Sequence, residues 1–192
     1  RKRKLNAVGR RLRAVTSKTS AGGVQFTQGA YIRTDNPHPD GKFSAARSTT
    51  WSMRIGVAGR DLANVEGPIA CVVADDKSEL GYQILLEDVD EKKPYRIVVR
   101  IHHDVRDSDG IEVATGPAIA RKGEAHLAVT YDGSRRASGI RIYVNGKALK
   151  LSASLDSLTG EVETGALLVL GTDSEAQSRA NFRDATFSGG QL

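Results

Sequence analysis

The segment from residue 126 to residue 147, HLAVTYDGSRRASGIRIYVNGK, decides the fold class of this chain. Its first part, 126–131, is an apolar, β-branched run that ends in tyrosine, and 139–144 alternates apolar and polar residues with the period of a β-strand. The Asp-Gly-Ser sequence at 132–134 favours a turn between them. Asn-Gly at 145–146 predicts a type I′ hairpin turn, because both central residues of that turn need positive φ. The segment therefore predicts antiparallel strands joined by tight turns, and it carries no obvious catalytic residues.

The rest of the chain has the same character. Short apolar or alternating runs are separated by stretches rich in Gly, Pro, Asp and Asn, and no long stretch has helical periodicity. The predicted strands are 23–27, 30–34, 48–57, 69–74, 81–87, 95–102, 111–115, 125–131, 139–145, 147–151 and 166–171. A chain of 192 residues with 39% hydrophobic content and 20 glycines is long enough for one sizeable core. We predict an all-β fold, a two-sheet antiparallel jelly-roll β-sandwich.

The stretches HLAVTYDGS and GIRIYVNGK resemble a known signature, W-H-H-V-A-V-T-Y-D-G-S followed by G-x-x-x-Y-V-D/N-G-K, of LamG-type domains in the concanavalin A-like lectin and glucanase group. Other parts of the chain resemble further strands of these domains, namely 23–34, 49–57, 81–87, 95–119 and 155–171. The stretches 95–119 and 155–171 are most similar to versions embedded in large secreted planctomycete proteins. The resemblance implies a concanavalin A-like sandwich and a secreted, periplasmic or cell-surface location.

The sequence departs from the family pattern at two places. The signature tryptophan before the histidine is replaced by Ala125. The ending FSGGQL (187–192) resembles the lead-in to the closing strand of the family, so the resemblance implies that the sandwich, 19–192, lacks that strand within this sequence. We expect another segment or another chain to complete it, since an unpaired sheet edge is a template for a further strand.

The net charge of +5 comes from the N-terminal segment. Residues 1–18 contain eight Lys or Arg and no acid, and the remainder has 20 basic and 23 acidic residues. We interpret 1–18 as a basic lead-in whose charges face water or a partner; binding to nucleic acid or another anionic surface is the alternative. No aromatic residue interleaves the basic ones, so nucleic acid is the less favoured partner.

Three tyrosines are the candidate ligand-binding residues. Tyr143 points away from the apolar face of its strand, and Tyr82 and Tyr95 flank an acidic hairpin. The single tryptophan, Trp51, alternates with apolar residues and is predicted to lie in the core. Cys71 is the single cysteine of the sequence, which excludes an internal disulfide, and it lies in an apolar run where it is predicted to be a buried small side chain.

A calcium site is the candidate cofactor site. The loop DNPHPDG (35–41) offers Asp35 and Asp40 as hard oxygen ligands, and Asp173 could join them in space. The resemblance implies the same, because LamG-type domains often hold calcium at the rim of the sandwich. An Asx-turn loop without an ion is the alternative. The neighbouring histidines His102 and His103 point to opposite faces of a strand and cannot chelate one metal together.

The acidic cluster 87–91 is predicted to be a solvated hairpin tip, since it does not match the alternating carboxylates of the glucanases. We therefore predict a non-catalytic recognition or accessory module in a larger secreted assembly, which binds carbohydrate or protein. The alternatives are a structural interaction domain completed by another chain and, less favoured, a glycan-active enzyme. No apolar run approaches the roughly 20 residues of a membrane span.

Overall fold

The hairpin predicted from residues 126–147 is formed by β11 (Gly123–Tyr131) and β12 (Ile140–Val144), which pair in antiparallel register. Asn145 and Gly146 have φ angles of 51° and 78°, which confirms the type I′ conformation of the turn. The turn is fixed by two bonds between one pair of residues: the Asn145 N–H donates to the His126 carbonyl (2.8 Å), and the Asn145 Oδ1 accepts from the His126 N–H (2.8 Å).

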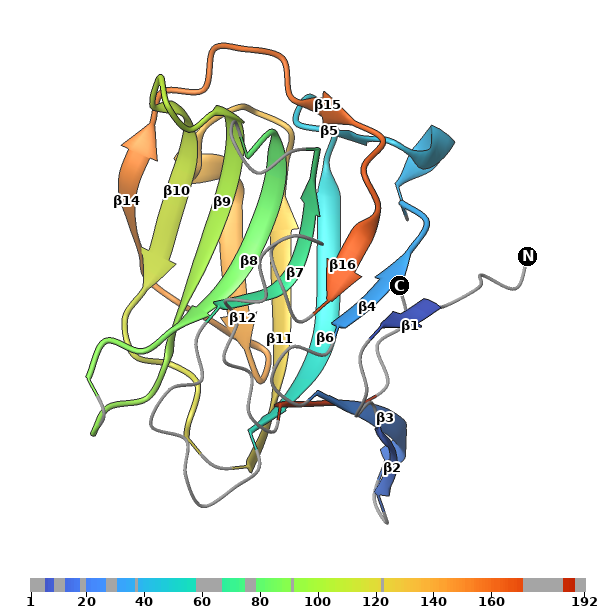
Figure 1. Ribbon diagram of the computed structural model, residues 1–192. Helices are drawn as coiled ribbons and strands as arrows, with labels where there is room; N and C mark the ends of the chain where they lie inside the picture. The colour runs from blue at the N-terminus through green and yellow to red at the C-terminus, as the bar shows by residue number, and fades with distance from the viewer. Residues whose placement is uncertain are drawn as a thin grey trace.

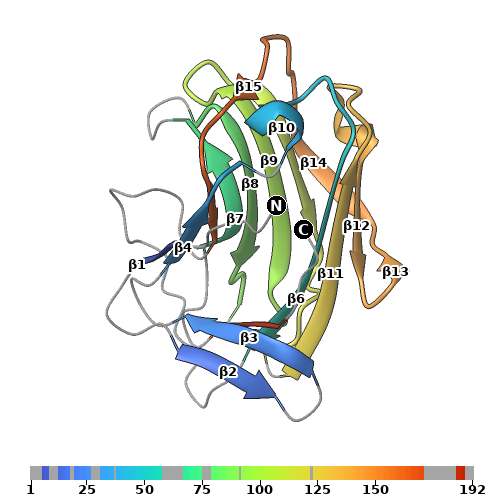
Figure 2. The same ribbon diagram turned by 90° about the vertical axis from the view of Figure 1, so that its right-hand side faces the viewer.

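The computed structural model describes residues 6–8, 13–17, 20–26, 31–57, 67–74, 79–170 and 185–188, except 37, 91 and 122; side chains are described only within 35–170. These residues form two antiparallel sheets that pack face to face (Figures 1 and 2). The predicted all-β, two-sheet jelly-roll sandwich is therefore confirmed. No α-helix occurs in the described part, and so no helix there is long and apolar enough to cross a membrane.

Eight of the described strands form the first sheet, in the order β1 (Asn6–Val8), β4 (Tyr31–Thr34), β16 (Leu168–Leu170), β7 (Gly67–Val73), β8 (Gly81–Glu87), β9 (Arg96–Asp104), β10 (Asp109–Thr115) and β14 (Leu151–Asp156). Seven form the second, in the order β13 (Lys147–Ala148), β12, β11, β6 (Thr49–Val57), β17 (Ala185–Ser188), β3 (Ser20–Phe26) and β2 (Arg13–Ser17). A short pair, β5 (Phe43–Ser44) with β15 (Glu163–Thr164), and two 3₁₀ turns, η1 (Pro39–Gly41) and η2 (Ala137–Gly139), complete the described elements.

The core lies between the two sheets and follows the alternation of the strands. Trp51, Met53 and Ile55 on β6 are buried on one face, as predicted. Val129 on β11 pairs with Trp51 on one side and with Ile142 on the other, so the hairpin of β11 and β12 continues the apolar row of β6. Burial of such rows against the opposite sheet is the main favourable term in the stability of a sandwich.

The predicted strands agree with the observed ones along most of the chain, but β1, β2, β5, β15 and β17 were not predicted, and one predicted strand is wrong. The sequence predicted a single strand over 147–151, but the structure divides it: β13 stays in the seven-stranded sheet, and β14 begins at Leu151 and pairs with β10 in the other sheet. The prediction was wrong because a run of alternating residues does not reveal that the chain crosses between sheets.

Two further predictions concern the ends of the sequence. Within the predicted lead-in 1–18, β1 pairs with β4 and β2 pairs with β3. The stretch that resembles the lead-in to a closing strand contributes to β17, which lies between β3 and β6. The boundary at residue 18 and the closing strand beyond residue 192 both stay predictions.

Candidate functional site

The outer face of the eight-stranded sheet carries a cluster of polar side chains that we call the polar face. It consists of Gln83 and Glu87 on β8, Arg96, Arg100 and His102 on β9, Glu112 on β10 and Ser154 on β14. Strand periodicity places them there, because the intervening residues on the same strands point into the core. Gln83, Arg100 and Glu112 lie side by side across three strands, and Glu87 lies opposite Arg96.

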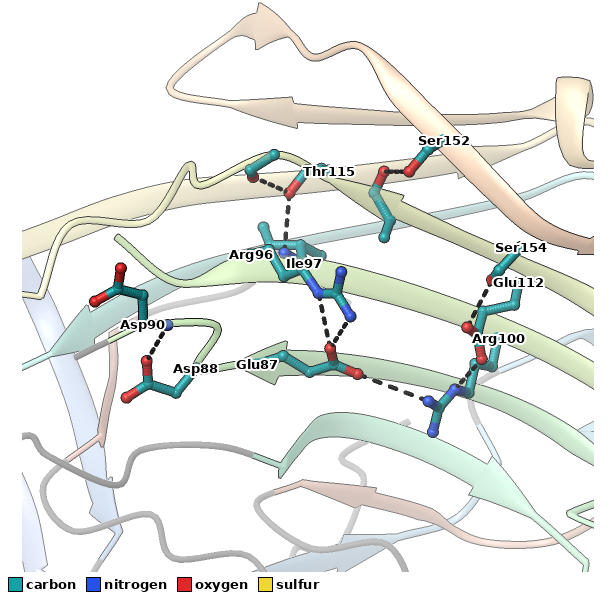
Figure 3. Close-up of polar contacts among 12 residues, drawn as sticks. Glu87, Asp88, Asp90, Arg96, Ile97, Arg100, Glu112, Thr115, Ser152 and Ser154 are labelled. Atoms are coloured by element: carbon teal, nitrogen blue, oxygen red, sulfur yellow. Dashed lines mark hydrogen bonds and ion pairs between the residues drawn. The ribbon is translucent and has the colours of Figure 1, made fainter. Parts of the chain in front are cut away.

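A continuous chain of ion pairs and hydrogen bonds runs across this face (Figure 3). Arg96 donates from Nε and Nη2 to Glu87 Oε2 at 2.8 and 2.6 Å. Arg100 lies between two carboxylates, with Nη2 3.6 Å from Glu87 Oε1 and Nε donating to Glu112 Oε2 at 2.6 Å. Ser154 Oγ donates to Glu112 Oε1 at 2.7 Å. The mutual contacts hold the four charged side chains in fixed positions on an accessible surface.

A β-bulge positions the last member of this chain. The β10–β14 register shifts between Glu112 and Val113, so that Glu112 pairs with Leu155 while Val113 pairs with Ala153. Ser154 is the additional residue at this shift. Bulges characteristically re-aim one side chain, and this one brings a hydroxyl to the Glu112 carboxylate.

A small apolar cluster of Leu85, Val98 and Ala114 lies on the same side of the sheet, separate from the main core. Val98 is only 1% exposed although it is on the outer face. It sits between Arg96 and Arg100 along β9, and the aliphatic stems of long charged side chains commonly cover such positions while their charged ends stay in water.

The electrostatics keep Glu112 ionised. Burial alone would raise its pKa, but the hydrogen bond from Ser154 and the charge and hydrogen bond of Arg100 outweigh this effect and lower the pKa. The side chains of Glu87, Arg96, Arg100 and Glu112 are between 25% and 39% exposed, so their remaining donors and acceptors can reach a ligand.

Two buried polar atoms on this face make no hydrogen bond within the described part of the chain: Gln83 Oε1 and His102 Nε2. Gln83 is 5% exposed and His102 is 4% exposed. The His102 ring packs over Gly110 of β10, where a Cβ would lie 2.2 Å from its Cδ2, and its Nδ1 is 3.5 Å from Glu79 Oε2. Buried polar groups normally have partners, so these two atoms mark unused hydrogen-bonding capacity. His103 is exposed, and the predicted opposite orientation of the two histidines is confirmed.

The structure corrects two of the three predicted ligand-binding tyrosines. Tyr82 is 1% exposed and packs against Phe43 and Trp51, and burial raises its pKa. Tyr95 is fully buried. Neither ring is accessible for stacking on a sugar, because both alternate onto the core side of their segments. Tyr143 is half-buried and lines a pocket between the sheets, and its role in ligand binding stays a prediction.

The loop 35–41, the predicted calcium site, contains an Asx turn, which is the alternative that the sequence left open. Asn36 is buried; its Nδ2 donates to the Thr164 and Ala166 carbonyls (3.2 and 2.9 Å), and its Oδ1 accepts from the His38 N–H (3.1 Å), which is an Asx turn. Asp35 is exposed, and Asp40 pairs with an arginine. No group of three or more His, Cys, Asp or Glu side chains arranged to hold a metal occurs among the described residues. Asp173 lies outside them, so the calcium site stays a prediction.

The acidic cluster 87–91 separates into two environments. Glu87 belongs to the polar face. Asp88 is held by Arg121, whose guanidinium also donates to the Tyr95 hydroxyl (3.1 Å) and lies over the Tyr95 ring (4.5 Å). The two described carboxylates of this turn thus have different partners: Asp88 pairs with Arg121, which is far away in sequence, and Asp90 lies 3.4 Å from Lys93.

The polar face was not predicted, although the sequence carries a signal for it. Arg96, Val98, Arg100 and His102 alternate with core residues along β9, so a polar outer face could have been predicted for this strand. The partner Glu112 could not, because its place depends on the register between β9 and β10.

No protein-family model matches the chain, and no curated protein sequence matches it. Solved structures share its fold. The botulinum neurotoxin serotype C1 binding domain has 11% identity and a TM-score of 0.64, over 97% of this chain and 42% of that chain. A carbohydrate esterase of the Shiga toxin-encoding bacteriophage phi24B has 14% identity and a TM-score of 0.55, over 96% of this chain and 86% of that chain. The carbohydrate recognition domain of Emp46p has 10% identity and a TM-score of 0.53, over 96% and 85%.

These likenesses show the fold alone. The chain spans less than half the length of the neurotoxin binding domain. The shared architecture is the two-sheet antiparallel jelly-roll sandwich that the sequence predicts.

Proposed function

We propose that this chain is a carbohydrate-recognition module and that the polar face is its saccharide-binding surface. The observation that carries the proposal is the chain of ion pairs from Arg96 to Ser154, which holds donors and acceptors in fixed positions on an accessible sheet face. Among proteins of the same fold, Emp46p has a domain named for carbohydrate recognition, which supports this choice of ligand.

The chemistry of the polar face suits a saccharide. Each arginine has five N–H donors, and the contacts described above engage only part of them. Sugar hydroxyls both donate and accept, so they can bond to the remaining guanidinium N–H groups and to the carboxylate oxygens of Glu87 and Glu112.

A non-catalytic role agrees with the electrostatics. Glycoside hydrolysis needs a carboxylic acid whose pKa is raised, so that it can donate a proton. The described carboxyl groups whose pKa moves are Asp90, Asp104, Asp109, Glu112 and Asp132, and all of them move downward. From the resemblance to LamG-type domains, we further propose that residues 19–192 act as an accessory module in a secreted assembly.

Glycan-array screening followed by isothermal titration calorimetry tests the proposal. Arg100→Met keeps an unbranched side chain and removes the positive charge, and Glu112→Gln removes the negative charge of its partner. We expect each to weaken binding of the array-selected glycan by about tenfold or more, since hydrogen bonds to charged groups contribute about 1.5–3 kcal/mol. Arg47→Met is the matched control, because Arg47 forms an exposed pair with Asp40 away from this face.

Three outcomes would contradict the proposal. If no glycan on a broad array binds the folded chain, the module does not recognise carbohydrate. If Arg100→Met and Glu112→Gln keep the unfolding temperature and the affinity of the original chain, the glycan binds elsewhere. If the chain releases products from the glycan it binds, the module is an enzyme.

A further inference from the structure

A pocket of about 340 Å³ opens between the two sheets, away from the polar face. It lies where β12 and the edge strand β13 of one sheet approach the edge strand β14 of the other (Figure 2). Its lining is mainly aliphatic, with Ser138, Arg141 and Tyr143 as the polar contributors. The aliphatic lining comes from Val113, Ala137, Ile140, Ile142, Ala148, Leu149, Leu151 and Ala153. A volume of this size suits one large apolar side chain or a small ligand.

The pocket lies beside a sheet edge where one backbone carbonyl of β12, that of Ile140, faces outward, while the Ile140 N–H donates to the Ala137 carbonyl. In an antiparallel strand, the N–H and carbonyl of one residue point to the same side, and the side alternates along the strand. The Ile142 carbonyl accepts from the Leu149 N–H (2.9 Å), so the backbone groups of Ile142 and Ile140 point away from β11. β13 pairs with Tyr143 and Val144. Ile140 therefore lies past the end of β13, and its carbonyl faces the open side of the sandwich.

The surroundings of the pocket are basic. Arg141 lines it, and Arg136, Lys147 and Lys150 are next in sequence to lining residues. All four side chains are exposed, and none forms an ion pair with another described residue.

Two acids lie near the same rim, and each accepts a hydrogen bond from a backbone N–H group. Asp132 Oδ1 accepts from Ser134 (2.9 Å), and Asp156 Oδ1 accepts from Ala137 (2.8 Å). The four basic side chains outnumber these two carboxylates, so the rim is complementary to a negatively charged partner.

We propose that this groove binds an extended acidic segment of a partner protein. The segment lies in extended conformation beside β12, past the end of β13, where the Ile140 carbonyl faces outward. It inserts one apolar side chain into the pocket and directs flanking carboxylates toward Arg141 and the neighbouring lysines. Extended peptides are commonly recognised beside sheets, where backbone hydrogen bonds give affinity and side-chain pockets give specificity. The aliphatic lining favours a peptide side chain over a sugar ring. This proposal is independent of saccharide binding on the polar face.

The probe is a set of fluorescein-labelled, terminally blocked octapeptides that alternate Asp or Glu with one apolar residue type, either Val, Leu, Ile or Phe. Anisotropy with the whole chain at low salt measures affinity, and amide chemical shifts locate the site. We expect saturable binding of at least one peptide, with shifts centred on Ile140, Ile142 and Leu149. Matching peptides with Lys in place of the acids are expected to bind at least tenfold more weakly.

Two variants test the two contributions separately. Arg141→Glu reverses the charge at the rim, and Ala153→Phe fills the pocket from an exposed position on β14. Each is expected to weaken peptide binding at least tenfold, while Arg100→Met, on the polar face, leaves it unchanged. The proposal is overturned if no acidic peptide binds, if the Lys peptides bind equally well, if the shifts centre on the polar face, or if both groove variants retain full affinity. Loss of glycan binding in Arg100→Met with intact peptide binding separates this proposal from the first.

Discussion

Replacement of Tyr131 by Phe removes one hydroxyl that ties β11 to two loops. The Tyr131 hydroxyl donates to the Ala45 carbonyl (2.7 Å) and accepts from the Arg135 N–H (2.9 Å). Tyr131 is 2% exposed and Ala45 is fully buried, so water cannot replace the lost partner of the Ala45 carbonyl without rearrangement. The ring itself packs in the main core and is retained by phenylalanine.

The cost follows from these contacts. A typical hydrogen bond contributes about 1 kcal/mol net, and a buried acceptor left without a partner costs about 1–3 kcal/mol. We therefore expect Tyr131→Phe to lower the free energy of unfolding by about 2–3 kcal/mol, since one of the two contacts is fully buried. For a domain of this size, that corresponds to a fall in the unfolding temperature of roughly 5–10 °C.

Urea unfolding followed by the tryptophan fluorescence of Trp51, together with calorimetry, measures the change. Trp51 is the only tryptophan of the chain and lies in the core, on the strand that pairs with β11. Tyr143→Phe is the matched control: it removes a hydroxyl from a half-buried tyrosine on β12 and is expected to change stability by less than about 0.5 kcal/mol. If Tyr131→Phe is as stable as this control, the inference that the buried hydroxyl stabilises the loops is refuted.

Three further perturbations have clear expected outcomes. Gly81 has a φ of 138° and a Cβ there would lie 1.8 Å from a carbonyl oxygen of β7, so Gly81→Ala should prevent cooperative folding in urea titration, whereas Gly116→Ala, with open space, should fold normally. Asn36→Asp replaces the donor to the Thr164 and Ala166 carbonyls with an acceptor and should lower the unfolding temperature at pH 7, with partial recovery at pH 4; an unchanged unfolding temperature would contradict the assignment of these two hydrogen bonds. Since the pKa of Glu112 is lowered in the folded state, its contribution to stability is present above the usual pKa of glutamate, about 4.3, and is lost as the pH falls through the folded value. The stability difference between the original chain and Glu112→Gln should therefore shrink as the pH falls from 7 to 3. A difference that stays constant would refute a stabilising role for the ionised Glu112.

The local patterns in the sequence were sufficient for the fold class. The type I′ turn at Asn145-Gly146 and the buried row Trp51, Met53 and Ile55 were both predicted from turn chemistry and strand period, and both are confirmed. These features depend on interactions between near neighbours in sequence, so a single chain without homologues reveals them.

The burial of individual side chains was harder to predict. Tyr82 and Tyr95 lie next to an acidic turn, and that position suggested accessible rings. Both are buried, because each belongs to the core-facing register of its segment and the opposite sheet covers it. Sequence position relative to a hairpin does not decide which face of the sheet a residue occupies when the flanking strand is apolar on both sides.

Residue spacing and backbone preference were enough to predict most of the strands, their turns and the sandwich class. The sites depend instead on how the two sheets pack. The pairing of Arg100 with Glu112 depends on strand register and on a bulge that re-aims Ser154. The pocket beside β12 exists because the chain after Ala148 crosses to the other sheet. Both arrangements join residues far apart along the chain, and such contacts are fixed by sheet packing rather than by local sequence.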